Sequence, residues 1–416
     1  MVRTYYTVIF FFLAIFLLGM NESVLAGPGL RNGEWRAVLE RKDGHTIVFN
    51  FESKDSAGKK ILYIRNAGER LLVDDIQYQG DSVLIKLPFF ESQLRAEVLG
   101  NGDLQGVWLK RGAENYQVVP FKAYYNNAER FAAGGRAPRG VEGRWKAVFT
   151  DARGRDTSLR VGEFVQTGDR VTGTFLDPTG DFRYLEGIVD GDSLRLSCFD
   201  GGHAYYFSAR VEGDRLTGGQ YFSGAAGYEV WTATKDEAAA LPDEFALTNW
   251  DKHAGPLHFT FKDIDGKQVS LSDKRFAGKV VLIQIMGSWC PNCMDETRFL
   301  SSFYNEYHSK GVEIIGLAYE RSTDFARSQA SLRSFQRRFD VQYPMLITGV
   351  AVGDPDRAAK TLPVLEKIVG FPTTIFLDKT GRISRVHTGF SGPGTGSHYE
   401  EQQKEIIRTV DELLKG

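Results

Sequence analysis

The pattern of apolar and polar positions changes about halfway along the chain. Up to residue 235, short stretches alternate between apolar and polar residues, as in Thr46–Phe51 and Ser193–Cys198, and Gly-Asp, Asn-Gly and Asp-Gly pairs separate them. Alternation with period two, interrupted by turn-forming residues, predicts antiparallel strands. We therefore expect an all-β architecture here, either a sandwich or a small barrel.

This β-rich region repeats itself. Gly33–Leu39 recurs as Gly143–Phe149, and Gly80–Ile85 recurs as Gly191–Leu196, at a spacing of about 110 residues. The repetition predicts two copies of one domain, and we place them at residues 27–127 and 138–236. The segments 126–140 and 235–244 are the predicted linkers. Trp35 and Trp145 occupy equivalent positions, and both are expected in a core.

Residues 251–416 follow a different pattern. Val280–Met286 is a mostly apolar run of strand length, and Val312–Ala318 is a second one. Between them apolar residues recur at helical spacing, which predicts a βαβ unit. We also predict a hairpin at 257–271, helices at 324–339, 363–369 and 397–414, and strands at 343–347 and 382–387. This order indicates a mixed sheet flanked by helices.

The first βα connection contains the sequence Trp289-Cys290-Pro291-Asn292-Cys293. Free backbone N–H groups and the helix dipole stabilise a thiolate at a helix N-terminus, so we expect a lowered pKa and a nucleophilic role for Cys290. Cys293 follows within one turn, where it can attack a mixed disulfide formed at Cys290. The pattern indicates a thiol-disulfide oxidoreductase.

Composition and charge narrow the alternatives. The 416 residues include 51 Lys and Arg against 53 Asp and Glu, a net charge of −2 that does not favour nucleic-acid binding. Besides the dithiol, the sequence contains one more cysteine, Cys198. It alternates with Leu194 and Leu196, so we expect it in the core; a role as a third redox cysteine is the alternative. The seven histidines are scattered, which disfavours a zinc site at the dithiol.

The N-terminus has the order of a secretory signal. Arg3 precedes the apolar run Val8–Leu18, and small residues follow at 23–27. We predict a signal peptide at residues 1–26 with cleavage after Ala26, and a periplasmic or otherwise exported protein. The alternative is an uncleaved segment that anchors the protein in the membrane, because residues 5–7 could lengthen the apolar run.

With the downstream sequence Phe371-Pro372-Thr373-Thr374, the Cys-x-x-Cys segment resembles the thioredoxin fold in its exported TlpA/ResA-like branch. The resemblance covers residues 251–416 only. It implies that Cys290 is the attacking thiol, Cys293 the resolving thiol and Pro372 a cis-proline facing them. The implied substrate-binding residues are Trp289, Pro291, Phe371 and Thr373. The complete fold is then two duplicated antiparallel all-β domains followed by an α/β thioredoxin-like domain.

Glu296 lies three residues after Cys293, on the same helical face. The resemblance places an acidic residue here, and a carboxylate could accept the Cys293 proton. Complementing the helix dipole is the alternative role. Thioredoxin itself carries a carboxylate at the position of Gln284, which cannot act as a base. Arg298 stands where relatives often have a proline, so the shape of this helix is open.

The resemblance also implies partners. They are exported proteins with cysteine pairs, including the haem-attachment cysteines of apocytochromes c, and a membrane thiol electron donor. The Cys290–Cys293 disulfide would be the redox group, without a further cofactor, metal or nucleic acid. The family favours a reductase. The alternatives are a disulfide donor and a non-enzymatic binding protein that acts through the β repeats; a peroxiredoxin would need a Pro-x-x-x-Thr-x-x-Cys motif, which is absent.

Overall fold

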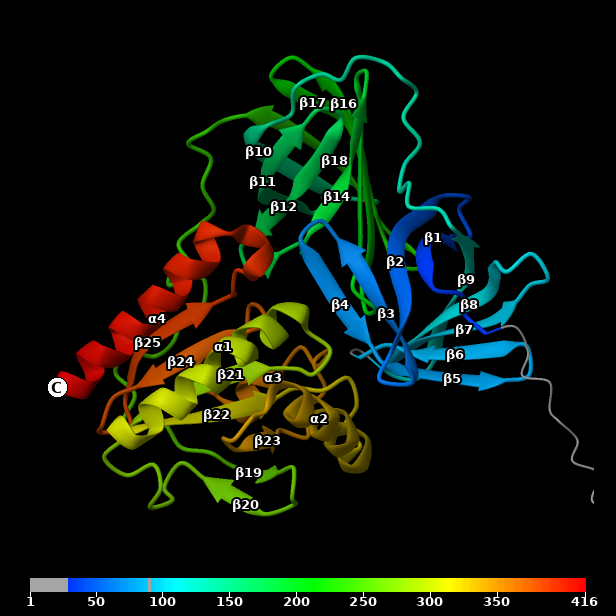
Figure 1. The fold of residues 1–416 in the computed structure, drawn as a ribbon. Helices are drawn as coiled ribbons and strands as arrows, with labels where there is room; N and C mark the ends of the chain where they lie inside the picture. The colour runs from blue at the N-terminus through cyan, green and yellow to red at the C-terminus, as the bar shows by residue number, and fades with distance from the viewer. Residues whose placement is uncertain (1–28, 89–90) are drawn as a thin grey trace, which may run out of the picture.

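The computed structural model describes residues 29–88 and 91–416, and these residues form three sheets. Figure 1 shows two all-β bodies from the N-terminal part of the chain, and a third body in which helices flank a sheet. The predicted signal peptide at residues 1–26 lies outside the described residues.

The first sheet is antiparallel and has the order β4-β3-β2-β1-β9-β8-β7-β6-β5. Alternate residues point into its core, as the period-two pattern predicts; Leu94, Ala96 and Val98 on one strand are buried, whereas Arg95 and Glu97 are exposed. Its strands are β1 (Gly33–Glu40), β2 (Thr46–Ser56), β3 (Lys59–Asn66), β4 (Glu69–Val73), β5 (Asp75–Gln79), β6 (Ser82–Lys86), β7 (Ser92–Val98), β8 (Leu104–Arg111) and β9 (Tyr116–Tyr125).

The second sheet is also antiparallel, and it closes into a barrel because β12 pairs with both β11 and β14. Trp145 and Cys198 are fully buried inside it, so Cys198 lies in the core. Its strands are β10 (Gly143–Asp151), β11 (Thr157–Thr167), β12 (Arg170–Asp177), β13 (Gly180–Asp181), β14 (Leu185–Asp190), β15 (Ser193–Phe199), β16 (Ala204–Glu212), β17 (Arg215–Ser223) and β18 (Gly227–Lys235).

The third sheet has the order β20-β19-β23-β22-β21-β24-β25, with β21, β22 and β23 parallel and the outer pairings antiparallel. Its strands are β19 (Thr260–Asp263), β20 (Gln268–Ser270), β21 (Val280–Met286), β22 (Val312–Ala318), β23 (Met345–Ile347), β24 (Thr373–Leu377) and β25 (Ile383–Thr388). The helices are α1 (Pro291–Tyr307), α2 (Phe325–Phe339), α3 (Arg357–Thr361) and α4 (Ser397–Lys415), with short 3-10 turns η1 (His308–Lys310) and η2 (Pro393–Thr395).

Both faces of this sheet are covered, which explains why β21 is buried along its whole length. Leu282 and Met286 pack with residues of α1, α2 and α4 on one face. Ile283 and Ile285 pack with Ala358 of α3 on the other. The central strand therefore runs through the middle of the domain and delivers the Cys-x-x-Cys segment to its edge (Figure 1).

One predicted helix is wrong. Residues 363–369 form turns and an isolated bridge between Trp250 and Leu365, and the helix in this region is α3. Glu366 N–H donates to the carbonyl of Asn249 instead of to a helical partner. Pairing with Asn249 and Trp250 thus replaces the local helical hydrogen bonds, a case in which tertiary contacts override propensity. Within the two described ranges, the structure has no helix long and apolar enough to cross a membrane.

Candidate active site

Cys290 caps the N-terminus of α1 and forms a disulfide with Cys293. Pro291 occupies the first helical position, where the missing N–H costs nothing. The Cys290 sulfur accepts a hydrogen bond from the Cys293 N–H at 3.2 Å, so a helix-terminal donor points directly at it. Cys290 is 3% exposed and Cys293 is fully buried. The first sulfur is therefore the one that lies closer to the surface.

Two aromatic residues flank this disulfide. The Phe371–Pro372 peptide bond is cis, as the resemblance implies, and the Phe371 carbonyl oxygen lies 3.4 Å from the Cys290 sulfur. Trp289 packs edge-on against the Phe371 ring with centroids 5.3 Å apart, and its indole N–H donates to the Tyr319 carbonyl. Trp289 and Phe371 are both half-buried, so each keeps an accessible edge beside Cys290.

The other two predicted substrate-binding residues differ in exposure. Pro291 is half-buried at the start of α1. Thr373 is fully buried, and its hydroxyl donates to the Gly370 carbonyl at 2.9 Å. The Thr373 side chain thus braces the turn that carries Phe371 and Pro372, and its backbone forms the start of β24, paired with β21 and β25.

Glu296 lies on the inner face of α1 and is fully buried. Its carboxylate accepts hydrogen bonds from the Thr374 hydroxyl at 2.6 Å and from the Gln284 amide at 2.7 Å. Burial raises the pKa of Glu296, and these two hydrogen bonds only partly offset that effect. The same Gln284 amide also donates to the Cys293 carbonyl, so the carboxyl group and the buried cysteine share one neighbour.

Sequence reasoning missed a second buried carboxylate near the dithiol, Glu320. It accepts hydrogen bonds from the backbone N–H and the hydroxyl of Ser288, both at 2.7 Å. Burial raises the pKa of Glu320 despite these bonds. Because Ser288 precedes the Trp-Cys pair, Glu320 fixes the loop that leads into α1. No local motif marks it, since it follows the next strand, β22.

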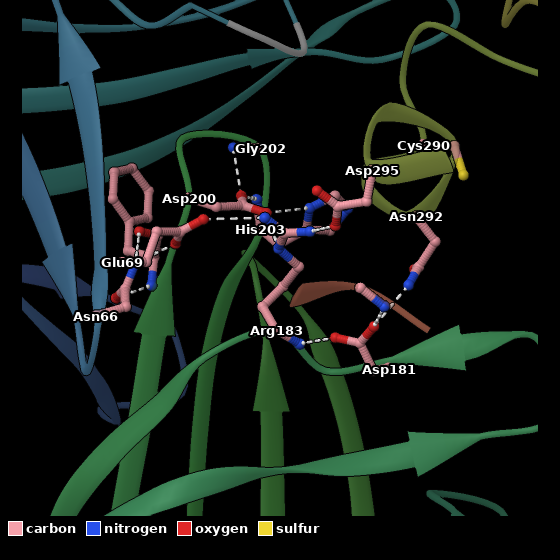
Figure 2. A network of polar contacts seen from close by, with 12 residues as sticks. Asn66, Glu69, Asp181, Arg183, Asp200, Gly202, His203, Cys290, Asn292 and Asp295 are labelled. Atoms are coloured by element: carbon pink, nitrogen blue, oxygen red, sulfur yellow. Dashed lines mark hydrogen bonds and ion pairs between the residues drawn. The ribbon is translucent and has the colours of Figure 1, made fainter. Parts of the chain in front are cut away.

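Sequence reasoning also missed the partners of the residue between the cysteines. The Asn292 amide donates to the Asp181 carboxylate and to the Phe390 carbonyl, both at 2.9 Å. Asp181 belongs to β13 of the barrel formed by the second sheet, so a β domain contacts the Cys-x-x-Cys segment directly (Figure 2). Burial raises the pKa of Asp181, and Arg183 opposes that effect.

Arg183 is the centre of a buried ion cluster that joins the two β bodies to helix α1 of the third body. Its guanidinium binds Asp295 of α1 and Glu69 of β4, the latter at 3.0 Å, and its Nε lies 3.8 Å from Asp200. Burial alone would lower the pKa of Arg183, but the surrounding carboxylates raise it well above the usual value. Arg183 has φ of +62°, a backbone conformation that non-glycine residues seldom adopt. Figure 2 shows its side chain reaching between the second barrel and α1.

In residues 29–88 and 91–416, no three His, Cys, Asp or Glu side chains are grouped so that they could hold a metal ion. The arrangement of the site is that of an exchangeable disulfide at a helix N-terminus, with a buried carboxyl group behind it.

Known proteins resemble this chain in its thiol domain. The Redoxin family model matches residues 252–402, a range that contains both cysteines and Pro372. The thiol-disulfide oxidoreductase ResA of Bacillus thuringiensis subsp. konkukian is 30% identical over 149 residues, which are 36% of this chain and 75% of the relative. The ResA of Bacillus subtilis is 27% identical over 132 residues, which are 32% of this chain and 64% of that protein.

Solved structures are also similar to this chain. A thioredoxin family thiol:disulfide interchange protein from Chlorobium tepidum is 20% identical with a TM-score of 0.31, covering 39% of this chain and 99% of its own. StoA from Bacillus subtilis is 20% identical with a TM-score of 0.26, covering 36% of this chain and 97% of its own.

Proposed function

Because this chain belongs to the ResA-like thiol-disulfide oxidoreductases, we propose that it reduces disulfides of exported proteins with the Cys290–Cys293 pair. The observation that carries the proposal is the position of the pair, with Cys290 capping α1 beside the carbonyl of Phe371. The predicted signal peptide supports export to the periplasm or an equivalent compartment.

In the first step, the Cys290 thiolate of the reduced protein attacks one sulfur of a substrate disulfide. A mixed disulfide forms, the substrate S–S bond breaks, and the departing substrate thiolate takes a proton. The Cys293 N–H and the N-terminus of α1 favour the thiolate form of Cys290. The cis-Pro372 turn presents the backbone of Phe371, to which an extended substrate segment can pair.

In the second step, Cys293 attacks the Cys290 sulfur and releases the reduced substrate. Cys293 must first lose its proton, and Glu296 accepts it. The buried site supports this role, because its raised pKa makes the carboxylate a stronger base than an exposed glutamate. Glu296 then gives the proton to the outgoing substrate thiolate or to solvent. Complementing the helix dipole does not require a fully buried carboxylate.

Each turnover leaves the protein oxidised, so a thiol donor must return two electrons. We infer that a membrane thiol electron donor does this, and that the substrates include proteins with haem-attachment cysteines of apocytochrome c type. The dithiol suffices as the redox group, since the exchange balances atoms and electrons without a further cofactor.

We further infer that the two β bodies are copies of one domain. Trp35 and Trp145 both lie on the first strand of their sheet and are fully buried. That first strand pairs in each case with the second strand and with the last one, as β1 does with β2 and β9. The shared topology supports the duplication that the repeated sequence segments predict.

The reduction potential tests the proposed direction. The full-length protein is equilibrated with glutathione buffers and its free thiols are alkylated and counted, with Cys290→Ser as the control that cannot form the pair. We expect a value below about −220 mV, which suits a reductase. A value near −120 mV would instead identify a disulfide donor, the alternative function, and would remove the suggested role on apocytochromes.

A further inference from the structure

Three segments of the thiol domain meet around the disulfide. Asn292 belongs to the first turn of α1, Gly370 and Phe371 belong to the cis-proline turn, and Gly389 follows β25. The Gly389 N–H donates to the Pro372 carbonyl at 2.8 Å, and the Phe371 carbonyl lies beside Cys290. These segments therefore form one continuous surface, over which a protein partner must approach Cys290.

A β-hairpin of the barrel formed by the second sheet lies on this surface. Its strands β12 and β13 pair through Leu176 with Asp181 and Asp177 with Gly180, which leaves Pro178 and Thr179 at the tip. The hairpin contacts all three segments, and glycine makes the approach of the tip possible at two of them. A methyl group on Gly370 would overlap the Thr179 side chain. One on Gly389 would lie 2.9 Å from the Thr179 backbone.

The third segment, the first turn of α1, is held by polar contacts. Gly180 packs so closely on Asn292 that a Cβ atom would come within 2.5 Å of that amide. Asp181 accepts hydrogen bonds from the Asn292 amide at 2.9 Å and from the Gly392 N–H at 2.6 Å. Directly after the hairpin, Arg183 pairs with Asp295 of α1. Buried charge as well as shape therefore fastens the hairpin.

We propose that the Pro178–Thr179 hairpin tip is an internal cover on the partner-docking surface of the dithiol. Its release from the three segments exposes Cys290 to protein substrates. The proposal rests on the proposed function, because it concerns access to the same cysteine pair. In the present arrangement Cys290 is only 3% exposed.

The hairpin does not cover every side of the Cys-x-x-Cys segment. A cavity of about 270 Å³ lies beside this segment, lined by Ser288, Trp289, Met294 and Glu320 together with Leu87 of the first β body; neither the two cysteines nor the hairpin residues line it. Figure 2 shows the Cys290 sulfur pointing away from the Arg183 cluster. A small dithiol needs less room at the disulfide than a folded protein, which needs the covered surface.

The test compares two reductants on the oxidised full-length protein. Dithiothreitol serves as the small dithiol and reduced thioredoxin as the protein dithiol, and alkylation of free thiols follows the reaction. Thr179→Arg places a long side chain against Gly370 and Gly389 and lifts the tip. Thr167→Arg, at the exposed end of β11 that pairs with the start of β12, is the matched control. Asp181→Asn is a second variant that weakens the anchor while preserving side-chain shape.

We expect Thr179→Arg to raise the rate with thioredoxin about tenfold, because a larger fraction of molecules is then competent to bind it. Asp181→Asn should act in the same direction, and the dithiothreitol rate should stay within about twofold, as should both rates in Thr167→Arg. If the ratio of the thioredoxin rate to the dithiothreitol rate stays unchanged in both hairpin variants, the proposed cover is overturned. If neither reductant opens the disulfide in any variant, the proposed function fails and the cover with it.

Discussion

The two faces of helix α1 place neighbouring carboxylates in opposite environments. Glu296 faces inward and meets only neutral donors, the hydroxyl of Thr374 and the amide of Gln284. Asp295 faces away from the thiol-domain core and meets two guanidinium groups, from Arg183 of the barrel and from Arg298 one turn later. Both carboxylates are almost completely buried, so their exposure does not distinguish them.

This difference shows that the charge of the hydrogen-bonding partners, and not burial alone, decides whether a buried carboxylate can take up a proton. Neutral donors leave the charge of Glu296 uncompensated, so burial raises its pKa and a proton can be taken up. Asp295 has cationic partners and suits a fixed structural contact. We therefore propose that the inner face of α1 moves the proton and that the outer face attaches the domain. The following predictions test that division.

The largest effect is expected for Cys293→Ser, which removes the resolving thiol from the inner face. Turnover of a protein disulfide should fall on the order of a thousandfold, while the first attack by Cys290 continues. A mixed disulfide with the substrate should then accumulate, and non-reducing electrophoresis with mass spectrometry would detect it. Turnover at the wild-type rate would show that the mixed disulfide at Cys290 is resolved without Cys293.

On the outer face, Arg183→Ala should lower the free energy of unfolding by about 3–5 kcal/mol, because it leaves buried carboxylates without their cation. Arg298→Ala is the matched control. The Arg298 side chain is 53% exposed, so its loss should cost no more than about 1 kcal/mol. Urea unfolding of the full chain measures both. Equal losses would contradict the special position of Arg183.

Glu296→Gln should slow the resolving step by about a hundredfold, because the amide cannot accept the Cys293 proton. Stopped-flow measurement of mixed-disulfide decay isolates this step. In the wild-type protein the rate should rise with pH through the raised pKa of Glu296, and this component should vanish in the variant. Asp295→Asn should lower stability without removing that pH component; if it did remove it, the two faces would not have separate roles.

The smallest predicted effect concerns stability and pH. The folded-state pKa of Glu296 is raised, so its stabilising contribution is complete at low pH and is lost as the pH rises through that value. Relative to Glu296→Gln, the wild-type protein should therefore become less stable with rising pH, by at most about 1.4 kcal/mol per pH unit. Denaturant unfolding at several pH values measures this difference, and a constant difference would show that Glu296 is not perturbed.

Local pattern was sufficient for much of the thiol domain. An apolar run of strand length followed by Cys-Pro-Asn-Cys predicts β21 and α1, and helical periodicity alone places Glu296 near Cys293. The predicted helix at 363–369 failed for the opposite reason, because Leu365 and Glu366 pair with Trp250 and Asn249, more than a hundred residues earlier. Periodicity describes contacts within one element and contains no information on such pairings.

The sequence by itself determined the chemistry of this protein, since a dithiol at a helix N-terminus and a carboxylate one turn later are local features. Only the tertiary structure decided what surrounds that chemistry. Asp181 and Arg183 lie more than a hundred residues before Asn292 and Asp295 and look like ordinary turn residues of a β-hairpin. The physical reason is that burial and charge pairing arise where separate elements meet, and the meeting of a hairpin tip with α1 is a property of the packed domains.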